Sequence, residues 1–566
     1  MVKIFDRLIS GLVIFILFLL ISGGAIIKTD FGKIEFSSLD PWVLALGLIV
    51  FIRLRASTQR LPALNWISHF IVKFNDITFS KLFSILALST TGFLLFFAHV
   101  FKEWSFNTHG YDQGFVHQPI FNVFTPNLLT CNLCATNSYF SEHLSFILVP
   151  VGLITSLISY DEVVFLLQTI ILILVPILTL IYSPLKNKKN LWPIFVIAIL
   201  SHKSYRSGFI WDFREDNLAL LFLTITGLSL LNKNWIGYIV FLTLSLLCKE
   251  NIGLVSVFFV FPIMLDKSLH IKYGTRVRIS LITVSICLIY TLIAFKFLMP
   301  YFGEGATRTT QLVTRFPRFG STPNEVLNNL FTRPMLLFNL ISTEFFRISV
   351  FKYLIFLFLP FIWFLLRSPW WIIPTLPGLA MNILSNADTQ ISMNFHYDQI
   401  ILPFLIIGSV SAAIAPKTRF SSRSISLILL FALAVSGRWP GFFVTHYFPS
   451  ISSIQDSFFL RNLDENVPII APWHVLGQLA YKKSLIPLNA TEFDVESDDE
   501  SVCLETLQLV NFKLKDSNIS IVFDRKSPVL SEANLSELIW KCRNSKGNEL
   551  LYQNSNSNRF FVIKSN

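Results

Sequence analysis

Carboxylates, cations and imidazoles stand beside long apolar runs at several places in this chain of 566 residues. Asp112 lies in Tyr111-Asp-Gln-Gly-Phe, among aromatic residues just after an apolar run. A carboxylate in such surroundings can act as a general base or hold a cation. It can equally be a loop-capping residue followed by a turn glycine, Gly114. The local sequence leaves both readings open.

Four charged residues directly precede a later apolar run: Asp212, Arg214, Glu215 and Asp216. An acidic side chain in the first turn of a helix is favoured by the helix dipole, and this accounts for Asp216. It accounts less well for Asp212, which stands between Trp211 and Phe213. We therefore favour a functional role for Asp212.

Two further polar pairs occur at the ends of apolar runs. Lys249 and Glu250 separate two such runs, and charges at membrane depth usually pair or line a cavity. A local ion pair is one reading, and phosphate binding by Lys249 is the other. His396 and Tyr397 precede another run. They can donate hydrogen bonds to a sugar or a phosphate, although Tyr397 also fits an interfacial aromatic belt.

The remaining histidine and cysteine patterns do not define a metal site. His143 follows Ser141, which fits a helix cap, and a structural role for His143 is favoured over catalysis. Cys131 and Cys134 form a lone Cys-x-x-Cys motif, and without a second motif a zinc site is not indicated. In an oxidising compartment we expect these two to pair, and Cys503 to pair with Cys542. No cofactor is indicated with certainty, and a divalent cation remains open.

The composition indicates that much of the chain is surrounded by lipid and not by water. Hydrophobic residues make up 53% of the chain, charged residues 14%, and the mean hydropathy is +0.59. A soluble protein carries about 25% charged residues. The net charge of +11 lies largely in short loops, as membrane topology requires, so nucleic acid is not an expected partner.

Without a phosphate-binding loop or dinucleotide fingerprint, an ATP-driven pump or nicotinamide enzyme is disfavoured.

The apolar runs predict an all-α polytopic membrane bundle of about thirteen spans. We place them at 8–27, 41–53, 82–100, 163–183, 191–201, 216–232, 235–248, 251–266, 279–299, 350–366, 370–384, 398–416 and 424–437. With a cytoplasmic N-terminus, the basic loops around Arg55, Lys188, Arg276 and Arg419 fall on one side. The run 143–159 is then a re-entrant or interfacial helix, and the C-terminus is extracytoplasmic.

Three regions follow from this topology. Residues 1–81 form an N-terminal transmembrane hairpin and cytoplasmic loop, and residues 82–449 form a transmembrane core with large outer loops at 101–143 and 300–348. Residues 450–566 are charged and polar and contain three short apolar runs that begin at Val467, Ile519 and Arg559. We expect a small extracytoplasmic α/β domain there.

Several blocks together resemble a known family. The blocks are Tyr111-Asp-Gln-Gly-Phe-x-x-Gln-Pro-Ile-Phe, Glu142-His-Leu-Ser, Trp211-Asp-Phe-Arg-Glu-Asp, Cys248-Lys-Glu-Asn-Ile-Gly, Arg318-Phe-Gly-Ser-Thr-Pro-Asn-Glu-Val and Phe395-His-Tyr. In order and spacing they resemble the predicted membrane proteins catalogued as domain of unknown function 2079, over about residues 85–480. The chain departs from that family at Arg214, where His is usual, at Glu215, where Pro is usual, and at Phe121, where Trp is commoner.

The family is similar in architecture to GT-C glycosyltransferases, and this resemblance implies an activity. A sugar would pass from a polyprenyl-phosphate donor to a lipid or glycan acceptor outside the cytoplasm, with inversion. Asp112 would be the base, and Lys249 with Arg308, Arg315 or Arg318 would stabilise the departing phosphate. His143, Asp212, Asp216, Glu250, His396 and Tyr397 complete the expected substrate-binding set.

A lipid or polysaccharide transporter or flippase is the alternative function. Transporters usually place their binding groups near the bilayer midplane in repeated halves. Here the polar candidates gather at the outer boundary, and no matching halves are evident. We expect a multi-pass protein of a bacterial inner membrane, surrounded by membrane lipids.

The topology gives the first testable prediction. Reporter fusions at Lys188 and after Ser450 should give opposite signals, because the positive-inside rule places the Lys188 loop in the cytoplasm and the tail outside. A reporter that is active only outside the cytoplasm makes the measurement. The same signal from both fusions would contradict this topology.

Overall fold

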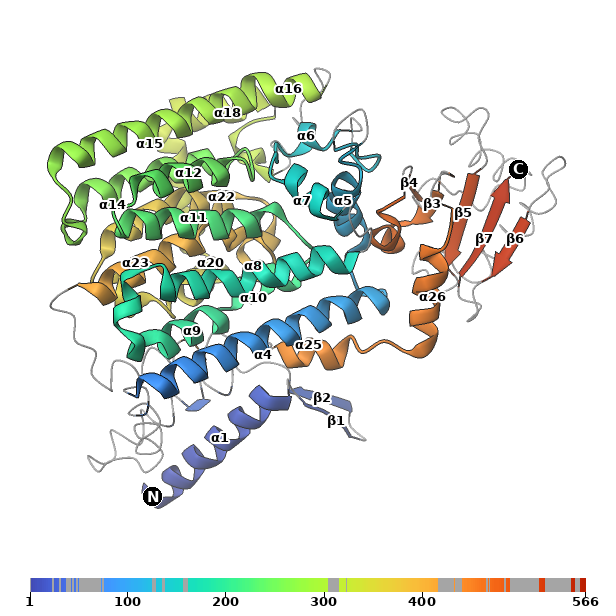
Figure 1. Cartoon of the computed structure of the whole chain (residues 1–566), viewed down its shortest axis with the longest axis horizontal. Helices are drawn as coiled ribbons and strands as arrows, with labels where there is room; N and C mark the ends of the chain where they lie inside the picture. The colour runs from blue at the N-terminus through green and yellow to red at the C-terminus, as the bar shows by residue number, and fades with distance from the viewer. Residues whose placement is uncertain are drawn as a thin grey trace. The chain divides into compact units, whose positions relative to one another are not determined.

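The structure is a computed structural model and is mostly helical, as the sequence predicts (Figure 1). Apart from a few isolated positions, it describes residues 2–22, 25–29, 32–36, 76–124, 129–134, 138–155, 161–303, 315–321, 323–415, 440–464, 469–482, 485–488, 519–524, 551–554 and 560–565. The chain divides into two compact units. The first comprises Met1–Ala98, His143–Ile147 and Leu166–His446, and the second comprises His99–Glu142, Leu148–Phe165 and Tyr447–Asn566.

Three helices among the described residues are long and apolar enough to cross a membrane. They are α4 (Ile77–Trp104), α8 (Asp161–Ile181) and the continuous helix Tyr273–Phe302, which comprises α15, a π-helical turn and α16. Only 17% of the most apolar window of Tyr273–Phe302 is buried. An apolar helix with so much free surface is suited to lipid contact. The count of thirteen spans stays a prediction.

Other expected spans are short or interrupted helices. The first unit contains α9 (Trp192–Ser201), α10 (Lys203–Ile210), α11 (Glu215–Leu231), α12 (Trp235–Leu246), α13 (Ile252–Ser256), α14 (Val260–Leu265), α20 (Ile348–Phe358), α22 (Leu376–Leu384) and α23 (Leu402–Ile414). Helix α11 packs against α12 and α23. A Cβ at Gly227 of α11 would lie 2.1 Å from the Ile407 side chain of α23, so this glycine permits the close approach. Most residues of the expected spans 41–53 and 424–437 lie outside the described residues.

The N-terminal helix is shifted from its expected position. Helix α1 covers Val2–Ser22, and the chain then forms an antiparallel hairpin of β1 (Ala25–Thr29) and β2 (Gly32–Phe36). The expected span to residue 27 therefore runs too far. The β-branched run Ala25-Ile-Ile-Lys-Thr favours a strand, because branched side chains pack well on a pleated surface.

The second unit contains a mixed five-stranded sheet in the order β4-β3-β5-β7-β6 (Figure 1). Its strands are β3 (Ile469–Pro472), β4 (Leu485–Leu488), β5 (Ile519–Asp524), β6 (Leu551–Asn554) and β7 (Phe560–Ser565). Strand β3 is parallel to β4 and β5, and β7 is antiparallel to β5 and β6. The three apolar runs of the tail supply β3, β5 and β7. Helix α26 (Ile451–Arg461) precedes the sheet in the chain.

Residues 110–121 of the first expected outer loop form helix α5 (Gly110–Phe121). Gly114 is thus a helical residue and not a turn glycine. A Cβ there would lie 3.2 Å from the carbonyl oxygen of Leu476, so its role is close packing. Two short helices of the same unit follow in the chain, α6 (Tyr139–Glu142) and α7 (Leu148–Thr155). With eight residues, α7 is about 12 Å long, too short to cross a bilayer.

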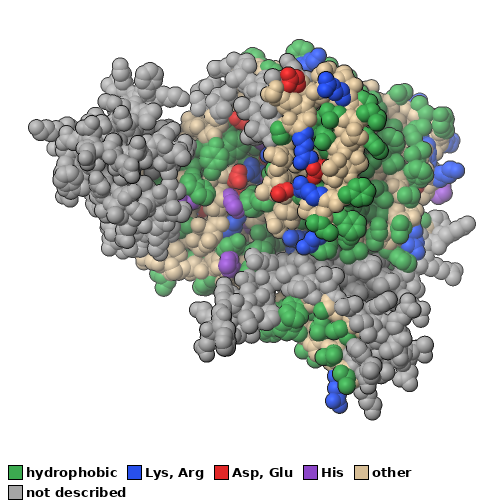
Figure 2. Space-filling model, turned by 180° about the vertical axis from the view of Figure 1, so that it is seen from behind, with side chains coloured by type: hydrophobic (Ala, Val, Ile, Leu, Met, Phe, Trp, Pro, Cys, Tyr) green, Lys and Arg blue, Asp and Glu red, His purple; other side chains and the backbone are tan. Residues whose placement is uncertain are grey.

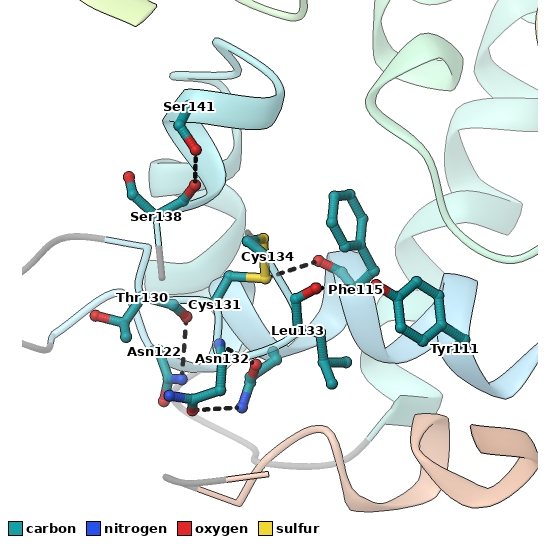
Figure 3. Close-up of a disulfide and its surroundings, with 11 residues drawn as sticks. Tyr111, Phe115, Asn122, Thr130, Cys131, Asn132, Leu133, Cys134, Ser138 and Ser141 are labelled. Atoms are coloured by element: carbon teal, nitrogen blue, oxygen red, sulfur yellow. Dashed lines mark hydrogen bonds between the residues drawn. A yellow bond between two sulfur atoms is a disulfide. The ribbon is translucent and has the colours of Figure 1, made fainter. Parts of the chain in front are cut away.

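Figure 3 shows the disulfide between Cys131 and Cys134, as expected for this motif. The Tyr111 hydroxyl of α5 donates a hydrogen bond to the carbonyl of Leu133, at 2.9 Å. Gln118 of α5 donates to the Asn132 side chain at 3.0 Å and accepts from the Asn132 backbone N–H at 2.9 Å. These bonds attach the disulfide loop to α5. Cys503 and Cys542 lie outside the described residues.

Candidate functional site

A buried lysine lies between two carboxylates in the first unit. The Lys249 ammonium donates to Asp216 Oδ2 at 2.8 Å and lies 3.1 Å from Glu215 Oε1. Lys249 belongs to the turn between α12 and α13, while the two acidic residues begin α11. Burial alone would lower the pKa of Lys249, but Asp216 and Glu215 outweigh it and raise the pKa above its ordinary value. This ammonium is therefore a fixed positive charge.

Glu250, the next residue, has different partners. Its Oε1 lies 3.2 Å from His143 Nδ1, and its Oε2 accepts the backbone N–H of Leu144 at 3.1 Å. Lys249 and Glu250 are thus not each other's ion-pair partners in the described part of the chain. Glu250 instead attaches residues 143–144 to the α12–α13 turn. His143 therefore has a contact that positions it, and its role stays a prediction.

His396 supplies a neutral imidazole beside this cluster. Its Nε2 lies 3.7 Å from Asp216 Oδ2, and burial, together with Arg214 and Lys249, holds the pKa of His396 well below its usual value. Its Nδ1 is buried and has no hydrogen-bond partner among the described residues. A neutral imidazole with an unused nitrogen can accept a proton or a hydrogen bond from a hydroxyl group.

Arg315 and Tyr397 form a second contact of the first unit. The guanidinium carbon of Arg315 lies 5.6 Å from the centre of the Tyr397 ring, a cation–π geometry. Arg315 has no carboxylate partner within the described part of the chain. Because the charge is not neutralised by a neighbouring carboxylate, Arg315 is suited to anion binding.

The other predicted residues lie elsewhere or in other contacts. Arg318 forms an ion pair with Glu344, and Arg308 lies outside the described residues. Asp212 is buried, 1% exposed. Asp112 belongs to the second unit, in the first turn of α5, and is half-buried. That position suits a carboxylate that interacts with the helix dipole. Its role as base stays a prediction.

No group of three or more His, Cys, Asp or Glu side chains among the described residues could hold a metal ion. In the first unit the Lys249 ammonium already provides positive charge between two carboxylates. The residues therefore do not fit a resident divalent cation in the Lys249 cluster.

Sequence reasoning missed a buried polar network in the second unit. Arg461 of α26 lies 2.8 Å from Glu162 Oε1 and 3.9 Å from Glu103 Oε1. Gln113 of α5 donates to Glu103 at 2.8 Å, and His117 Nδ1 lies 2.6 Å from Asp161 Oδ1. Arg461 and Glu162 are 299 residues apart and His117 and Asp161 are 44 apart, so no local spacing predicts these two pairs. The local signal for this network is Gln113 in the Tyr-Asp-Gln-Gly-Phe block.

Charged and hydrophobic side chains of the described residues are both visible on the face of the molecule drawn in Figure 2. Figure 2 shows one face with broad hydrophobic areas and with the charged and His side chains grouped between them. This grouping is what lipid contact requires, because charges are costly where they face hydrocarbon.

The model of the predicted membrane protein family DUF2079 matches residues 102–491 of the chain. This chain belongs to that family. No curated protein matches the sequence. A solved structure, ArnT from Cupriavidus metallidurans bound to undecaprenyl phosphate, aligns with a TM-score of 0.46 at 10% identity, over 85% of this chain and 97% of that one.

The buried charges of this DUF2079 protein generate a stability prediction. Lys249→Met removes the ammonium and leaves two buried carboxylates without their cation, which typically costs about 3–5 kcal/mol. The measurement is thermal unfolding of purified protein in detergent. The control is Lys186→Met, because Lys186 is exposed and has no carboxylate partner in the described chain. Equal unfolding temperatures for the two variants would contradict the assignment.

Proposed function

We propose that this DUF2079 protein is a membrane glycosyltransferase that moves a sugar from a polyprenyl-phosphate donor to an acceptor hydroxyl outside the cytoplasm. The observation that carries the proposal is the polar cluster at the ends of apolar helices. It combines two buried carboxylates with a neutral imidazole and an arginine, and within the described part of the chain the imidazole has an unused nitrogen and the arginine has no carboxylate partner. Carboxylates and imidazole bind sugar hydroxyls, and a guanidinium binds phosphate.

The family resemblance implied that Lys249, with Arg308, Arg315 or Arg318, stabilises the phosphate, and the contacts of these side chains distinguish between them. Lys249 is neutralised by two carboxylates, and Arg318 by Glu344. A phosphate would have to displace these partners, and the desolvated carboxylates would then be left without a cation. Arg315 requires no such exchange. We therefore assign the donor phosphate to Arg315 and a positioning role to Lys249.

The proposed reaction is a single displacement. The acceptor oxygen forms a bond to the anomeric carbon while the bond from that carbon to the phosphate oxygen breaks. The hydroxyl proton passes to a general base, and polyprenyl phosphate leaves as an anion stabilised by Arg315. Asp216, His396 and Tyr397 orient the sugar. Attack opposite the leaving group inverts the configuration of the anomeric carbon.

Arg315→Gln tests whether Arg315 binds the phosphate of the donor. Removal of one group that stabilises transition-state charge typically lowers kcat by about 10²–10³-fold. The assay follows label from a polyprenyl-phosphate sugar into acceptor in proteoliposomes. Arg367→Gln is the matched control, because Arg367 is exposed and bonds the carbonyl of Trp363. Equal losses in both variants would remove Arg315 from the site. Labelled lipid that crosses the bilayer without a change of mass would identify a transporter instead.

Asp112→Asn tests the base in the same assay. The amide keeps the shape of the side chain but cannot accept the proton, so transfer should fall by about 10²–10⁴-fold at unchanged protein stability. The stability is checked by thermal unfolding. Transfer at the wild-type rate would show that Asp112 is a helix-terminal residue only, and that the base is another group.

A further inference from the structure

Helix α19 (Pro334–Phe345), within the second expected outer loop, has one face packed against protein. The side chains of this face are apolar and contact the small core formed by Phe319, Val326 and Leu384. They are Leu336, Leu337 and Leu340. This contact anchors α19 and α18 (Pro323–Thr332) to the rest of the first unit.

A second apolar face of α19 is exposed. Met335, Phe338, Ile341 and Phe345 are 68%, 65%, 38% and 47% exposed. Their spacing of three and four residues places them on one side of the helix. Asn339 and Thr343, which are four residues apart, are also exposed and form a polar strip next to this face. The helix is therefore amphipathic on its outer side.

The exposed apolar surface continues onto α20. Ile348, Phe351 and Ile355 are 81%, 50% and 39% exposed, and their spacing is again helical. Helix α20 (Ile348–Phe358) is one of the shorter apolar helices and overlaps the first half of the expected span 350–366. The exposed face of α19 thus leads directly into a segment of the chain that is suited to lipid.

Cations flank this surface. Arg333 precedes α19 directly, and Lys352 lies one turn into α20. Neither has a carboxylate partner among the described residues. Basic side chains beside an apolar helical face are the features of a helix that binds an anionic bilayer surface.

We propose that α19 is an interfacial helix that lies in the boundary between head groups and acyl chains of an anionic leaflet. Its twelve residues extend about 18 Å, whereas a hydrocarbon core is about 30 Å thick. Helix α19 therefore lies along the membrane surface and does not cross it. Phe338 and Phe345 enter the acyl region, Thr343 faces the aqueous side, and Arg333 and Lys352 bind lipid phosphates. The proposal does not depend on glycosyl transfer.

Site-specific photocrosslinking tests this orientation in the full chain. The photoreactive residue benzoylphenylalanine replaces Phe338 in one variant and Thr343 in another. Each variant is reconstituted in vesicles of phosphatidylcholine with phosphatidylglycerol and irradiated, and lipid adducts are measured by mass spectrometry. Position 343 is the matched control, because it lies on the same helix and is also exposed.

We expect about tenfold more lipid adduct from position 338 than from position 343, because only the apolar face enters the acyl region. The double variant Arg333→Gln, Lys352→Gln should lower the phosphatidylglycerol share of the adducts while the protein stays inserted. Equal lipid adducts at both positions would overturn the proposal. So would adducts from position 338 to protein only, which would show that a second copy of the chain or another of its segments covers the face.

Discussion

The pairing of Lys249 with Glu215 and Asp216 is the constraint on which the arrangement of the first unit depends. All three charges are buried, and a buried charge is tolerated only with an opposite charge and hydrogen bonds around it. The ion pairs therefore fix the start of α11 against the turn between α12 and α13. Asp216 also faces His396, and Glu250 of the same turn binds the segment that contains His143. One electrostatic requirement thus brings residues of four separate segments into a single polar cluster.

The second unit meets the same requirement with different residues. Arg461, from the tail, is buried against Glu103 and Glu162, which lie at the ends of the two long apolar helices α4 and α8. Gln113 of α5 donates a hydrogen bond to the Glu103 carboxylate. A buried ion pair adds little net stability over an apolar replacement, but the loss of one partner is strongly destabilising because the other charge is left buried. In this unit the ion pairs join Arg461 of the tail to glutamates that lie at least 299 residues earlier in the sequence.

The features that the sequence predicted are those that depend on a local pattern of residues. Apolar runs indicated the helical membrane character, and three apolar runs of the tail are strands of the sheet. The positions of Lys249 and Asp216 at the ends of apolar runs marked them as polar candidates, and the structure brings the two side chains together. Their mutual pairing was not predictable, because thirty-three residues separate them and Glu250 offered a nearer partner. A turn at Gly114 was one of two readings that the local sequence left open, and the structure excludes it, because Gly114 is helical and lies close to Leu476.

The most direct test of this account is an experimental structure of the DUF2079 protein with polyprenyl phosphate bound, determined by cryo-electron microscopy. We expect density for the phosphate group against the Arg315 guanidinium, with Lys249 still between Glu215 and Asp216. Such a result would establish Lys249 as an internal counter-ion and Arg315 as the ligand of the anion. A phosphate on Lys249, with the ion pairs to the two carboxylates broken, would contradict the account.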